Sequence, residues 1–171
     1  MSLNEYHLQF LEHLVRHNVK FIVVGGQAQY FQCPNYETAD LDIWASLAPD
    51  NRKRLEQALV SWSRQHPQHT NRPLTPPLNL RPNIQIHFPE SDGVGYINRA
   101  KKMAQVDANQ GIDVLTSLGD LDFDDSLSRA GTISIESLAL NYLKPIAGVN
   151  GGVGWGCCMT FGSFGKSIVV S

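Results

Sequence analysis

Apolar residues recur at helical spacing in two stretches of the chain, and each stretch predicts an amphipathic helix. One apolar stripe lies near the amino terminus, and the other follows Pro49 and Asp50, a pair that suits a helix start (Leu3, Tyr6, Phe10, Leu11, Leu14; Leu55, Ala58, Leu59, Trp62). A last helix is predicted over IESLALNYL (135–143), with Ser134 as its cap and Glu136 in its first turn.

Short apolar runs between these helices predict strands, which are KFIVV (20–24), TADLDIWA (38–45), IQIHF (84–88) and GIDVLTSL (111–118). Gly25 and Gly26 end the first run, and QAQYFQ (27–32) predicts a short helix that Pro34 stops. The proline-rich stretch 66–83 predicts an extended surface loop, and 91–103 is ambiguous. This order of elements predicts an α+β fold, in which helices pack on a mixed β-sheet.

The length of 171 residues suits one domain, which we expect to span residues 1–147. A net charge of −2 gives no overall attraction to nucleic acid or to anionic membranes, so any phosphate binding must be local. Three cysteines do not indicate a disulfide framework, and the first ten residues lack the pattern of a signal peptide. We therefore expect a cytoplasmic location.

Residues 148–171 differ in composition from the rest because they hold seven of the fourteen glycines. We expect this tail to be disordered or aberrant. It is too polar and glycine-rich for a typical membrane span, so no membrane contact is expected. GSFGKS (162–167) resembles a phosphate-binding P-loop, but Thr160 occupies the position of the first glycine, so we reject a P-loop there.

Two carboxylates, Asp40 and Asp42, interrupt the second apolar run. Residues two apart on a strand point to the same face, so the two carboxylates should project together, about 7 Å apart at Cα. Leu41 and Ile43 should then point into the core. Burying an unpaired carboxylate is unfavourable, and two ionised carboxylates side by side favour a divalent cation between them.

Gly25 and Gly26 stand at a strand-to-helix turn. Without side chains there, backbone N–H groups can approach an anion, and the helix start adds its partial positive charge. An anion-binding turn and a pair of carboxylates, joined by one short helix, predict a site for a metal-bound polyphosphate.

The pattern over residues 21–60 resembles the nucleotidyltransferase superfamily, which has a polymerase-β-like core and the motif hG[GS] followed by Dh[DE]h. Within that superfamily, TADLDIW followed by APDN is similar to small bacterial abortive-infection and toxin–antitoxin nucleotidyltransferases. The resemblance implies transfer of an NMP from an NTP to a hydroxyl of a protein or RNA acceptor, with Mg²⁺ or Mn²⁺, and a cognate toxin or antitoxin as partner. It also implies that Gly25, Gly26 and Thr38 bind the nucleotide.

The superfamily uses a third carboxylate on a later strand, and Asp113 in GIDVLTSLGDLDF is the candidate. The resemblance then makes Asp40, Asp42 and Asp113 the catalytic metal ligands. His87 and Gln85 are the rivals for the third position, and a turn-capping role for Asp113 is the structural alternative.

The chain departs from the family pattern at two positions. Tyr36 lies two residues before Thr38, at a position where the family pattern has a basic residue. Tyr142 lies near the position of a lysine on the family's final helix. Both changes weaken triphosphate binding, so two further interpretations stay open. One is a nucleotide-binding module without turnover, and the other is a structural domain whose acids form salt bridges.

Overall fold

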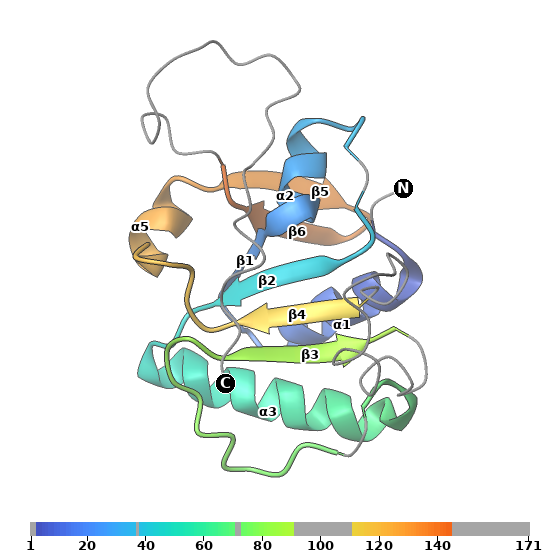
Figure 1. Ribbon diagram of the computed structural model, residues 1–171, viewed down its shortest axis with the longest axis vertical. Coiled ribbons are helices and arrows are strands. Elements are labelled where there is room, and N and C mark those ends of the chain that lie inside the picture. The colour runs from blue at the N-terminus through green and yellow to red at the C-terminus, as the bar shows by residue number, and fades with distance from the viewer. Residues whose placement is uncertain (1–2, 37, 71–72, 91–110, 145–171) are drawn as a thin grey trace, which may run out of the picture.

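The structure, a computed structural model, describes residues 3–36, 38–70, 73–90 and 111–144 (Figure 1). These residues form a mixed α+β fold in which helices flank one six-stranded mixed sheet. The predicted fold class is confirmed at that level. In chain order, the elements are α1 (Glu5–Arg16), β1 (Phe21–Val24), α2 (Gly25–Gln32), β2 (Leu41–Ala45), α3 (Pro49–Gln65), a 3₁₀ turn (Pro67–His69), β3 (Gln85–Pro89), β4 (Gly111–Leu115), α5 (Phe123–Ser128), β5 (Gly131–Ile135) and β6 (Leu138–Tyr142).

The strands lie in the order β3-β4-β2-β1-β6-β5. Two neighbouring pairs are parallel, β2 with β4 and β1 with β6, and the other pairs are antiparallel. Strand β2 is therefore internal, between β1 and β4, so its residues have backbone neighbours on both sides.

Alternation along the strands separates two faces of the sheet. Leu41 and Ile43 are fully buried on the face that packs against α1 and α3, as predicted. In Figure 1, α1 lies behind the sheet. Trp44 belongs to a smaller apolar cluster on the opposite face, which includes Ile22 and contacts Phe123 of α5. Asp42 and Asp113 share that second face because each alternates with residues of the main core.

The predicted last helix over 135–143 is wrong, because this segment forms the hairpin of β5 and β6. Ile135 pairs with Leu138 across the turn at Glu136, whose φ is 53°. Leu138 and Leu140 are buried while Ala139 is exposed, the alternation of a strand. The position that we assigned to a helical lysine, Tyr142, is therefore on a strand.

The Tyr142 ring has a packing role in this hairpin. It pairs in register with Gly131, and a Cβ built on that glycine would lie 2.2 Å from Cζ of the tyrosine ring. The same ring meets Phe31 of α2 edge to face, with centroids 5.7 Å apart. These two contacts give a packing reason for a tyrosine at position 142.

Other sequence predictions have mixed outcomes. The stretch 66–83 contains only the short 3₁₀ turn as regular structure within its described part, in agreement with the predicted loop. The ambiguous stretch 91–103 and the tail 148–171 lie outside the described residues. None of the helices in the described ranges combines the length and the apolar character that crossing a bilayer requires.

Candidate active site

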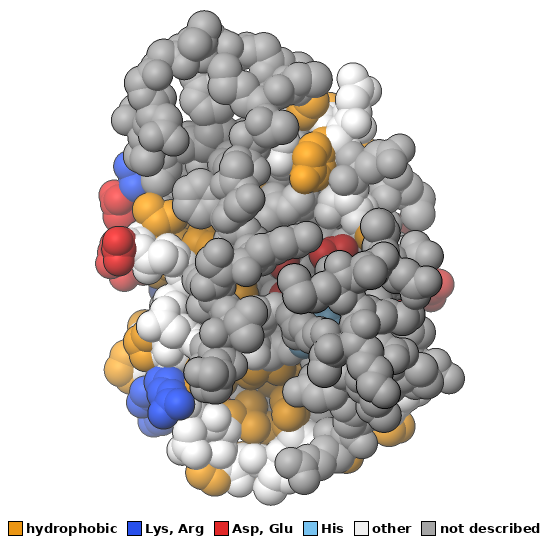
Figure 2. All heavy atoms as spheres, viewed as in Figure 1, with side chains coloured by type: hydrophobic (Ala, Val, Ile, Leu, Met, Phe, Trp, Pro, Cys, Tyr) orange, Lys and Arg blue, Asp and Glu red, His pale blue; other side chains and the backbone are white. Residues whose placement is uncertain are grey.

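Three polar side chains form a row across the second face of the sheet. Asp42 of β2 is in register with Asp113 of β4, and Asp113 is in register with His87 of β3. Neighbouring strands are about 4.8 Å apart, so these three side chains are adjacent. Figure 2 shows acidic side chains beside a histidine near the centre of this face.

Asp113 and His87 form a hydrogen-bonded pair. The distance from His87 Nδ1 to Asp113 Oδ1 is 2.7 Å, and the side chains are 13% and 17% exposed respectively. His87 was a rival of Asp113 for the third position in the sequence analysis. The structure places both at the site, one bonded to the other.

Asp42 is the most perturbed carboxylate of the group. It is half-buried, and no described residue donates a hydrogen bond to its carboxylate. Burial, with the negative charges of Asp113 and Asp40, raises the pKa of Asp42 from 3.8 to about 7. Ionisation of Asp42 is therefore disfavoured up to neutral pH, and a cation beside the carboxylate would favour it.

The Asp42 carboxylate lies directly against the glycine turn at the start of α2. Gly25 has a φ of 65°, and a Cβ built on it would lie 2.2 Å from Asp42 Oδ2. Only glycine satisfies both the backbone conformation and this close approach. The backbone of Gly25 is exposed, and no side chain caps the amino terminus of α2. The turn therefore retains backbone N–H groups that an anion can reach.

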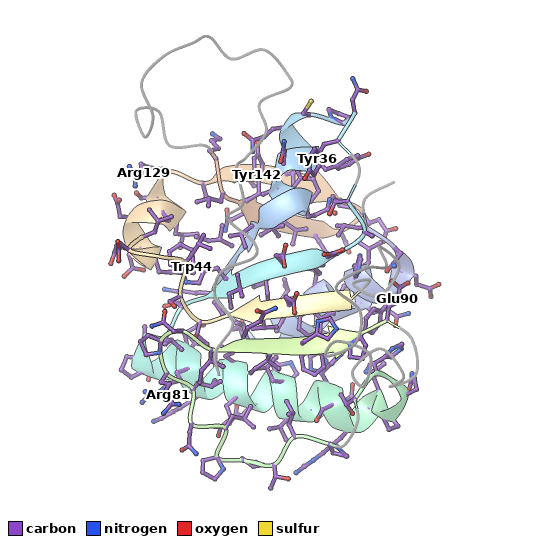
Figure 3. The ribbon with its side chains drawn as sticks, viewed as in Figure 1. Tyr36, Trp44, Arg81, Glu90, Arg129 and Tyr142 are labelled. Atoms are coloured by element: carbon purple, nitrogen blue, oxygen red, sulfur yellow. The ribbon has the colours of Figure 1, made fainter. Side chains whose placement is uncertain are left out.

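Gly26 is close to two other residues of the predicted site. A Cβ built on Gly26 would lie 2.6 Å from Thr38 Oγ1 and 3.4 Å from Cε1 of Tyr36. Thr38 Oγ1 also donates to the carbonyl of Asp40, at 3.5 Å. Figure 3 labels Tyr36 beside α2. The segment after α2 thus folds back beside the glycine turn, and Tyr36 provides no positive charge there.

Asp40 immediately precedes β2 and is half-buried. Its negative charge is one of the causes that raise the pKa of Asp42, but Asp40 lies before the strand on which both carboxylates were predicted. However, among the described residues no three His, Cys, Asp or Glu side chains stand close enough together to hold a metal ion. The structure therefore brings together Asp42 and Asp113 in register, with Gly25, Gly26 and Thr38 beside the turn, but no preformed three-ligand metal site.

A shallow hollow elsewhere carries none of these residues. It lies where α3 meets the proline-rich segment, and Val60, Arg64 and Pro76 are among its lining residues. It has neither the carboxylates nor the exposed helix start of the row on the sheet, so we do not assign the function to it.

Comparison of the chain with protein-family models, with curated proteins and with solved structures finds no match. The resemblance to nucleotidyltransferases thus has no support from relatives. What the site does must be inferred from its own residues.

Proposed function

We propose that this chain is a metal-dependent nucleotidyltransferase with a polymerase-β-like fold, which moves an NMP from an NTP to a hydroxyl of a protein or RNA acceptor in the cytoplasm. A cognate toxin or antitoxin is the partner that the sequence motif suggests. The proposal is based on one observation above all, the environment of Asp42.

A structural carboxylate normally has a cation or several hydrogen-bond donors around it. Asp42 instead has two other carboxylates near it and no donor among the described residues. Its carboxylate lies close to Gly25, at the uncapped amino terminus of α2. A negative cluster beside an anion-binding turn is what a bound cation with a phosphate would complement.

The donor set fits magnesium or manganese. Mg²⁺ is usually held by one or two protein carboxylates together with the phosphates of the substrate, so a protein cage of three ligands is not required. Asp42 with Asp40 would hold the ion, and Asp113 would join on the side of the acceptor. The bound cation would neutralise phosphate charge and lower the pKa of the acceptor hydroxyl.

The chain itself would position the reactants. N–H groups of Gly25 and Gly26 would receive the β- and γ-phosphates, with the positive end of the α2 dipole behind them. The acceptor oxygen would attack the α-phosphorus and lose its proton to water, and the bond from that phosphorus to the bridging oxygen would break, releasing pyrophosphate. Orientation and charge neutralisation are the main contributions of a protein to such phosphoryl chemistry.

A second candidate is a nucleotide-binding module without turnover. Tyr36 favours it, because this uncharged side chain lies beside Gly26, where a basic residue would neutralise phosphate charge. Both candidates require Mg²⁺-dependent binding of an NTP, and only the first requires transfer.

The test measures binding and transfer separately. Calorimetry with ATP or GTP, with and without Mg²⁺, would measure binding, and label transferred from the α-phosphate to the protein or to RNA would measure transfer. Asp42→Asn should abolish both, whereas Asp120→Asn, a change at an exposed turn, should alter neither. Binding without transfer supports the second candidate. Absence of Mg²⁺-dependent binding in the parent protein refutes both.

A further inference from the structure

The sheet ends at β5, and within the described part of the chain no strand pairs with the outer edge of β5 (Figure 1). We propose that this edge is an interface for a second copy of the chain, whose own β5 pairs with it antiparallel across a twofold axis. The two sheets then continue into one another. This inference does not depend on the proposed function, because it uses no residue of the candidate active site.

Two residues of β5 direct their backbone groups away from the sheet. The hairpin loop between Ile135 and Leu138 has two residues, and the strand residues that flank such a loop exchange both of their backbone hydrogen bonds. Since bonded and non-bonded pairs alternate along an antiparallel ladder, the N–H and C=O groups of Thr132 and Ser134 point outward. Both residues are exposed, and no described turn, loop or side chain bonds to these backbone groups. The edge therefore offers N–H donors and carbonyl acceptors to another strand.

The sequence of β5 lacks the features that protect edge strands from pairing. The strand GTISI (Gly131–Ile135) contains no charged residue and no proline, and it pairs with β6 without a bulge. The strand at the other edge, β3, ends in Pro89, which has no N–H to donate. The Pro89 carbonyl also accepts a hydrogen bond from His69 Nδ1, at 2.9 Å. Strand β5 is therefore the less protected of the two edges.

One register allows two identical β5 strands to pair through these groups. With Ile133 on the twofold axis, Thr132 of one copy lies opposite Ser134 of the other, and the two residues can exchange both of their backbone hydrogen bonds. The axis repeats this pair, so each copy donates twice and accepts twice. Ile133 and Ile135 are half-buried and pack against the main core. In this register Ile133 meets the Ile133 of the second copy, so the apolar face of the sheet continues across the axis.

The ends of the paired strands are complementary in charge. Glu136, in the turn after β5, would lie opposite Ala130 of the second copy and beside its Arg129. Both charged side chains are exposed, and Arg129 forms an ion pair with Asp125 of its own chain. The axis repeats the contact, so a pair of opposite charges lies on each side of the central isoleucines. A second copy of this chain therefore supplies the strand length, register and charge that match β5.

The test measures the mass of the full chain by sedimentation at protein concentrations from about 1 to 500 µM. An interface of one strand from each copy is small, so the parent should change from one chain to two within that range. Thr132→Pro removes an outward-facing N–H, and proline is tolerated where the N–H of an edge strand faces solvent. Thr132→Val keeps the N–H and is the matched control. Thermal melts check that both variants fold.

The Kd for dimerisation should rise at least about tenfold in Thr132→Pro, because the twofold axis removes two hydrogen bonds at once. It should not change in Thr132→Val. A parent that is monomeric at every concentration, or a Kd that is unchanged in folded Thr132→Pro, would overturn the interface.

Charge reversal tests the register and also decides the matter if Thr132→Pro does not fold. Arg129→Glu and Glu136→Arg should each raise the Kd, because each places like charges together at both ends of the interface. The variant that carries both changes should restore the parent Kd, since the charges are then opposite again. A double variant that dimerises no better than the single variants would overturn the proposed pairing.

Discussion

The strongest prediction concerns Asp42→Asn in the absence of metal. Asparagine has nearly the shape of a protonated aspartate but cannot ionise. Since burial and two neighbouring carboxylates disfavour the ionised form of Asp42, this substitution should stabilise the protein at pH 8. The result is unusual because most substitutions at partly buried positions destabilise a fold.

The size of the effect follows from the pKa. The pKa of Asp42 is higher in the folded protein than in the unfolded chain, so between these two values the folded state binds more protons. The stability that protonated Asp42 contributes is therefore present at low pH and is lost as the pH rises from about 4 to about 7. A pKa change from 3.8 to about 7 corresponds to about 4 kcal/mol of unfolding free energy at pH 8. This value is an upper limit, because the partly exposed side chain can recruit water.

The assay is thermal unfolding followed by circular dichroism in EDTA. In a chain of this size, 1 kcal/mol changes Tm by about 2–4 °C, so Asp42→Asn should raise Tm at pH 8 by up to about 8–16 °C. Near pH 4 the parent and the variant should melt together. Asp120→Asn, in an exposed turn, is the matched control and should show no such pH-dependent gain.

The metal-loaded protein should behave in the opposite way. Mg²⁺ with ATP should raise Tm of the parent but not of Asp42→Asn, because a ligand stabilises only as far as it binds the native state. A Tm that falls in Asp42→Asn at pH 8, with no magnesium effect in the parent, would show that Asp42 is paired structurally. The metal-site interpretation would then be abandoned.

Three further predictions follow from other parts of the structure. Gly25→Ala should destabilise the fold by about 1–2 kcal/mol and abolish nucleotide binding, since alanine is strained at a φ of 65° and its Cβ displaces the Asp42 carboxylate. An unchanged denaturant midpoint and an unchanged nucleotide affinity would contradict the contact between Gly25 and Asp42. A chain ending at Ala147 should stay folded, because the Leu143 amide that donates to Val23 is retained and the tail lacks a periodic apolar face; aggregation or loss of circular dichroism signal would show that the tail packs. Burial lowers the pKa of His7 to about 4, so the stability linked to this residue should be lost as the pH falls from 6.5 to 4. The Tm of a folded His7→Leu variant should therefore fall less than that of the parent over this pH range.

Much of the fold could be predicted from local patterns. Helices α1 and α3 and the first four strands follow from spacing that is visible within one segment, such as the alternation that buries Leu41 and Ile43. The segment 135–143 was misassigned because Ile135, Leu138 and Leu140 fit helical spacing nearly as well as strand alternation. What decides between them is pairing of β6 with the distant β1, through Val23 and Tyr142.

The same limit separates what was predicted at the site from what was not. Asp40, Asp42 and Asp113 interrupt apolar runs, so each is conspicuous in its own segment. The contact of Asp113 with His87 depends on strand order and register, which no single segment specifies. Likewise, the approach of Asp42 to Gly25 requires the antiparallel pairing of β1 with β2.

The position of β1 has a consequence for synthesis of the chain. Its final neighbours are β2 and β6, and β6 begins only at Leu138. Until β6 has been made, the four buried residues of β1 form an open, apolar edge of a partial sheet, the kind of edge that pairs with other chains. At about 5–20 residues per second, translation from β1 to β6 lasts on the order of 10 s. Ribosomes stalled within this interval should therefore carry nascent chains that aggregate or require chaperones.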